Sequence, residues 1–110
     1  MLHLEQYTTA IKGVPAGHSA LIPLLNNRAV CYLKANIYKP CIADCMSVLE
    51  MSPSDTKALL RRAQAYEATE SLDLALADFR SVSSLSPGDR MAVDGVQRIQ
   101  KGAGGAFGFV

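Results

Sequence analysis

The sequence lacks tryptophan, is poor in aromatic residues and carries almost no net charge. Its 110 residues include four Tyr and three Phe, and the formal charge at pH 7 is +1. A charge this small provides no broad electrostatic footprint for nucleic acid or for an acidic membrane surface. No apolar run approaches the roughly 18 residues that a membrane-spanning helix requires. We therefore expect a chain that binds neither nucleic acid nor membrane.

The cysteines are few and odd in number. Cys31, Cys41 and Cys45 follow no secretory signal, which favours a reducing, cytoplasmic setting. Cys41 and Cys45 lie one helical turn apart, and burial as small side chains on one helix face is a simpler interpretation than a redox pair. His3 and His18 have no Cys, Asp or Glu at catalytic or metal-ligand spacing. The sequence therefore predicts no enzyme active site, no cofactor and no metal.

What the sequence does contain is a repeat with a period of 34 residues. Hydrophobic residues make up 49% of the chain and are mostly Ala, Leu, Ile and Val, a composition that favours close-packed helices. A shift of 34 residues aligns identical residues along a whole unit. The first unit contributes Arg28, Ala29, Tyr32, Ala43, Asp44, Ser47, Val48, Ser52 and Pro53, which recur as Arg62, Ala63, Tyr66, Ala77, Asp78, Ser81, Val82, Ser86 and Pro87. Such a period is typical of a helix-turn-helix solenoid.

Each unit has the pattern of two amphipathic helices joined by a short polar turn. Apolar residues recur at helical spacing in both halves, and the turns are expected at 35–39 and 69–71. Proline residues at the end of each unit, Pro53 and Pro87, stop the second helix. Ser54 or Asp55 is then expected to cap the next first helix, and Asp89 the one after it.

The segments NRAVCYLK at 27–34 and KALLRRAQAY at 57–66, with the unit-ending prolines, resemble the tetratricopeptide-repeat (TPR) family. That resemblance implies an all-α fold, a right-handed superhelical stack of antiparallel helix hairpins. The sequence departs from the family pattern in two ways. Cys41 and Cys45 stand where the family usually has Ala and an aromatic residue, and Arg28 and Arg62 stand where Leu is common. Because small, soft side chains can fill those contacts, we expect the fold to be retained. Arg62 is expected to pair with acidic groups between helices.

The two ends of the chain differ from the repeats. The predicted TPR domain, 1–101, comprises a half repeat at 1–15, repeats at 20–53 and 54–87, and a capping helix at 89–101, followed by a Gly-rich flexible tail at 102–110. The half repeat has no first helix, and half a repeat cannot bury its apolar face alone. Leu4, Tyr7 and Ile11 are therefore expected to contact a missing segment, a partner or a second copy. Gly95 should weaken the capping helix by about 1 kcal/mol relative to Ala.

Candidate binding residues lie on the first helix of each repeat, which lines the concave side of such a stack. Lys57 and Arg61 are four residues apart, and Asn27 precedes Arg61 by one period, so the three should lie together. A guanidinium, an ammonium and an amide form a donor cluster suited to a carboxylate. These residues are similar to those of dicarboxylate-clamp TPR domains, a resemblance that implies binding of the acidic Glu-Glu-Val-Asp terminus of heat-shock chaperones. The clamp would be incomplete, since the family also uses residues of the missing helix.

Five further residues are weaker candidates. Val30 and Leu60 could receive apolar side chains of a peptide, and Asn26, Lys34 and Gln64 lie on or near the same face. Against the clamp stands the interpretation of Lys57 and Arg61 as an ordinary solvated face. The sequence thus predicts a chaperone-cofactor adaptor, with a structural scaffold that docks through the incomplete first repeat as the alternative. An enzymatic role would require a catalytic domain elsewhere in a longer polypeptide.

Overall fold

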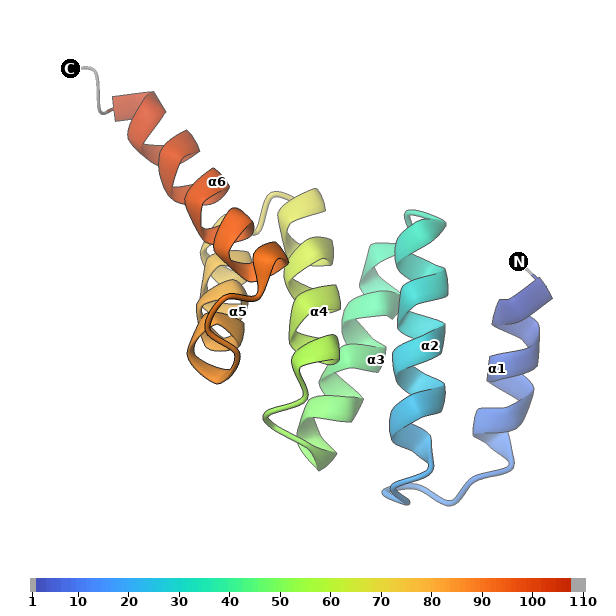
Figure 1. Cartoon of the computed structure of the whole chain (residues 1–110). Coiled ribbons are helices and arrows are strands. Elements are labelled where there is room, and N and C mark those ends of the chain that lie inside the picture. The colour runs from blue at the N-terminus through green and yellow to red at the C-terminus, as the bar shows by residue number, and fades with distance from the viewer. Residues whose placement is uncertain (1, 108–110) are drawn as a thin grey trace.

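The computed structural model describes the backbone of residues 2–107 and the side chains of residues 3–102, and this part of the chain is helical without any strand. The helices are α1 (Leu2–Lys12), α2 (Leu21–Lys34), α3 (Tyr38–Met51), α4 (Thr56–Ala68), α5 (Leu72–Leu85) and α6 (Arg90–Phe107). They form an elongated stack of 55 × 27 × 19 Å in which α2 pairs with α3, and α4 pairs with α5 (Figure 1). The predicted fold class, stacked antiparallel helix hairpins with a closing helix, is confirmed. None of these helices combines the length and the apolar composition that crossing a bilayer takes.

The helix boundaries follow the expected capping chemistry. Asp55 precedes α4, and its Oδ1 accepts a hydrogen bond from the backbone N–H of Ala58 at 2.9 Å. Asp89 precedes α6 and accepts from the N–H of Ala92 at 3.0 Å. Each bond satisfies a donor that the start of a helix leaves without a partner. The two predicted aspartate caps are therefore confirmed.

The arginines that depart from the family pattern form an ion pair inside each hairpin. Arg28 of α2 donates to both carboxylate oxygens of Asp44 of α3, at 2.7 and 2.8 Å. Arg62 of α4 makes the same paired contact with Asp78 of α5, both bonds being 2.8 Å long. The hydrogen bonds with the carboxylates raise the pKa of each arginine above its ordinary value. The expected pairing of Arg62 with an acidic group between helices is confirmed, and the period repeats it at Arg28.

The cysteines of α3 are core residues. Cys41 and Cys45 are fully buried, which agrees with their interpretation as small packing side chains. The hydrogen bond with Cys41, together with burial, raises the pKa of the Cys45 thiol far above its ordinary value. Cys45 is therefore a neutral thiol at physiological pH, and a neutral thiol is a poor nucleophile.

The closing helix α6 corrects two expectations. Gly95 is buried against Phe79 of α5, and a Cβ atom at this position would lie 2.6 Å from the ring. Glycine is therefore what allows α6 to approach α5, rather than a weak point. The predicted non-helical tail is wrong for residues 102–107, because α6 continues to Phe107. Extending a formed helix adds one hydrogen bond per residue. Ala103 and Ala106, which lie among Gly102, Gly104 and Gly105, also favour helix. The rest of that prediction, at 108–110, lies outside the described residues.

The first helix of the described chain packs against α2. Ile11 and the following Val14 contact the core shared by α2, α3 and α4, and Thr8 accepts a hydrogen bond from Arg28 at 3.2 Å. Leu4 and Tyr7 remain half-buried. Their expected contact with a further segment, a partner or a second copy stays a prediction, as does the division of the chain into repeats.

Candidate functional site

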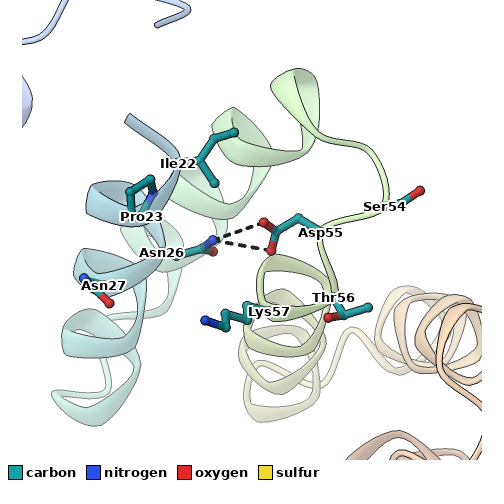
Figure 2. A pocket seen from close by; sticks show the side chains of 8 residues that line it. All are labelled: Ile22, Pro23, Asn26, Asn27, Ser54, Asp55, Thr56 and Lys57. Atoms are coloured by element: carbon teal, nitrogen blue, oxygen red, sulfur yellow. Dashed lines mark hydrogen bonds between the residues drawn. The ribbon is translucent and has the colours of Figure 1, made fainter. Parts of the chain in front are cut away.

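A pocket opens between α2 and the start of α4. It has a volume of about 530 Å³ and is lined by Ile22, Pro23, Asn26, Asn27, Ser54, Asp55, Thr56 and Lys57. Figure 2 shows α2 on one side, the loop and first turn of α4 on the other, and the Lys57 side chain reaching toward α2. The repeat brings these two helices together, because the first helix of one hairpin packs beside the first helix of the next.

Two of the three predicted clamp residues meet in this pocket. Asn27 comes from α2 and Lys57 from the first turn of α4, and both side chains are exposed. They present a neutral amide and an ammonium to the same space. Arg61 follows Lys57 by one turn of α4 and lies outside the lining of the pocket. The pocket therefore brings together Asn27 and Lys57 but not Arg61. We call Asn26, Asn27 and Lys57 of the pocket, together with Arg61 and Gln64 of the following turn of α4, the wall between α2 and α4.

Arg61 is half-buried and incompletely hydrogen-bonded. Its Nη1 donates to Oε1 of Gln64 at 3.2 Å, so Gln64 holds one arm of the guanidinium. Its Nε is buried and has no hydrogen-bond partner. A buried polar atom without a partner costs free energy, commonly about 1–3 kcal/mol. Gln64 thus holds the Arg61 guanidinium in place, while its Nε–H remains without an acceptor.

Asn26 is the most buried polar member of the pocket, with 7% of its surface exposed. Its Nδ2 donates to both carboxylate oxygens of Asp55, each at the long distance of 3.4 Å. Its Oδ1 is buried without a partner. Sequence reasoning placed Asn26 at the edge of the site and used Asp55 as a helix cap alone. The pair has no counterpart one period later, where Leu60 replaces Asn26, so the repeat gave no signal of it.

The remaining predicted site residues, Val30, Leu60 and Lys34, do not line this pocket. Val30 of α2 is half-buried. Leu60 retains 8% of its surface exposed and packs in the core formed with α5 and α6, which leaves little of it for a peptide. Lys34 is exposed but lines a different pocket, of about 320 Å³, with His3 and Leu4 of α1. Of the eight predicted site residues, the pocket between α2 and α4 gathers Asn26, Asn27 and Lys57.

This arrangement suits binding rather than bond-breaking chemistry. The wall offers the Lys57 ammonium, the Arg61 guanidinium and the Asn27 amide, which are donors to carboxylate oxygens. Within the described residues, no group of three or more His, Cys, Asp or Glu side chains could hold a metal ion.

No protein-family model matches the sequence. The structure is similar to the second TPR domain of human RPAP3, solved in complex with the HSP70 peptide SGPTIEEVD. The TM-score is 0.78 with 33% sequence identity, and the match covers 88% of this chain and 78% of that one. This chain belongs to the TPR family. The myosin chaperone UNC-45 from C. elegans, in complex with a Hsp90 peptide, gives a TM-score of 0.85 with 32% identity, over 94% of this chain and 12% of that one.

Among curated proteins, sperm-associated antigen 1A of Danio rerio is 42% identical over 102 residues. The match covers 89% of this TPR chain and 24% of the relative. The chain therefore spans about a quarter of the length of the curated relatives that it matches first.

Proposed function

We propose that this TPR chain is a chaperone-cofactor adaptor that works in the cytoplasm and binds the acidic C-terminal peptides of heat-shock chaperones. One observation carries the proposal. Among the described residues, two buried side-chain polar atoms lack a hydrogen-bond partner, Asn26 Oδ1 and Arg61 Nε, and they belong to α2 and α4, the two helices that border the pocket. Such atoms are rare in folded proteins and call for a specific explanation. A ligand that supplies the missing partners provides one.

The peptides bound by similar domains match the charge of this wall. The peptide in the RPAP3 complex ends in Glu-Glu-Val-Asp, which carries side-chain carboxylates beside the terminal one. We assign the terminal carboxylate to Asn27 and Lys57, and a side-chain carboxylate to the Arg61 guanidinium. Gln64 orients Arg61 through its hydrogen bond. Val30, half-buried on α2, contacts an apolar side chain of the peptide.

The test is a titration of the 110-residue chain with a peptide ending in Glu-Glu-Val-Asp, as the free acid and as the C-terminal amide. The acid should bind, its affinity should fall as salt rises, and the amide should bind far more weakly. Arg61→Ala should weaken binding by at least about tenfold, because it removes a charge-assisted hydrogen bond.

Arg80→Ala is the matched control for charge. Arg80 is exposed on α5 and lines a different pocket, so removing it should leave the affinity nearly unchanged. Equal affinities for acid and amide, or an Arg61 variant that binds as tightly as the Arg80 variant, would rule out the clamp.

A second function, a structural scaffold that docks through α1, is favoured by the pocket between α1 and α2. Besides Lys34 and His3, this pocket is lined by Leu4, Cys31 and Ala35, and apolar side chains of both helices therefore border it. Sedimentation of the chain across a range of concentrations tests self-association at this surface. A Leu4→Asp variant with unchanged sedimentation would exclude it.

A further inference from the structure

The Asn26 amide has a defined orientation. Carboxylate oxygens can only accept hydrogen bonds, so the amide nitrogen of Asn26 must face Asp55, and its oxygen must face away. Asp55 is itself fixed, because its Oδ1 also accepts from the N–H of Ala58 and caps α4. The position of Asp55 at the start of α4 therefore determines that the oxygen of the Asn26 amide, and not its nitrogen, lacks a hydrogen-bond partner. The free side is an acceptor, and it lies in the same pocket as the Asn27 amide and the Lys57 ammonium.

An acceptor at this place cannot serve a carboxylate. Asn27 and Lys57, which we assign to the terminal carboxylate of the peptide, line the same pocket as Asn26. In the last residue of any peptide, the main-chain N–H is separated from the carboxylate only by the Cα atom. When the carboxylate lies at Asn27 and Lys57, that N–H is the nearest peptide donor to Asn26. Asp55, a second acceptor beside it, further disfavours an anionic group.

We infer that Asn26 accepts a hydrogen bond from the main-chain N–H of the peptide's last residue, and that Asp55 is the positioning residue that turns its oxygen toward the peptide. The inference rests on the proposed function and deepens it. Asn26 Oδ1 is shielded from solvent in the free chain, so wall side chains must move to admit the donor. Lys57 is the exposed wall cation that the carboxylate attracts.

The test replaces the last amide bond of the Glu-Glu-Val-Asp peptide by an ester, which removes the N–H and keeps the carboxylate. For the unaltered chain the ester should bind about two- to tenfold more weakly than the amide-linked peptide. In Asn26→Ala the two peptides should bind equally. In Asn27→Ala both should bind more weakly while their ratio stays as in the unaltered chain, because that residue serves the carboxylate.

Asp55→Asn tests the positioning role while keeping the fold, since Asn caps helices as well as Asp does. The new amide oxygen still caps α4, and its nitrogen faces Asn26, which turns its own oxygen away from the peptide. The ester-to-amide ratio should fall toward one, although removal of a negative charge favours an acidic peptide. An unchanged ratio in both Asn26→Ala and Asp55→Asn would overturn this inference alone. Failure of both peptides to bind the unaltered chain would overturn the proposed function as well.

Discussion

Replacing Gly95 by Ala has two opposing effects on the stability of the chain. Helix propensity favours Ala by about 1 kcal/mol in the interior of a helix. The new Cβ would lie 2.6 Å from Cδ2 and Cε2 of Phe79, and 2.7 Å from Cγ. Phe79 has 1% of its surface exposed, so its ring has no room to retreat. Overpacking a buried site costs up to about 3 kcal/mol, and the net result should be a loss of about 2 kcal/mol.

Thermal unfolding followed by circular dichroism measures this loss, which corresponds to a Tm lower by about 5–10 °C. Gly102→Ala is the matched control on the same helix, because a Cβ at Gly102 meets nothing within 4 Å. The control should gain up to about 1 kcal/mol from propensity alone. Opposite signs for the two substitutions support close packing of α6 on α5. If Gly95→Ala raised the Tm as Gly102→Ala does, the steric argument would be wrong.

Two further substitutions test the backbone and the ion pairs. Glu70 has φ of +62°, a left-handed conformation that Asn tolerates better than Glu, and the equivalent residue of the previous unit is Asn36. Glu70→Asn should therefore stabilise the chain by about 0.5–1 kcal/mol. Glu50→Asn, inside α3, should not stabilise it. Arg62→Ala leaves the Asp78 carboxylate buried without its partner and should destabilise the chain by about 2–3 kcal/mol, as measured by urea unfolding. Arg62→Leu combined with Asp78→Leu should recover most of that loss, and no recovery would mean that the charges themselves are stabilising.

The sequence was sufficient to predict the hairpins because their determinants are local and repeated. Apolar spacing, the unit-ending prolines and the aspartate caps all act within a few residues along the chain, and the period shows each of them twice. Gly95 could not be interpreted in this way, because its role depends on a contact with Phe79 in another helix. The Asn26 and Asp55 pair joins two helices through positions that the next repeat does not duplicate.

The same difference between repeats explains why binding is expected at one junction. One period beyond the polar wall, Asn26, Asn27 and Pro23 are replaced by Leu60, Arg61 and Lys57, and a second period gives Asp94, Gly95 and Met91. At the junction of α4 with α6, Leu60 is therefore buried in the core, and a glycine faces α5 where Arg61 would recur.

At that second junction, the equivalent positions pack the closing helix α6 onto the stack. At the places equivalent to Lys57 and Arg61 it has Met91 and Gly95, so it lacks the two cations that α4 supplies to the first junction. The α2 and α4 junction keeps its donors at the cost of two unpaired buried atoms. Under the proposed function, an acidic peptide supplies partners for these two atoms and recovers that free energy on binding, so affinity and the lower stability of the free wall have one physical origin.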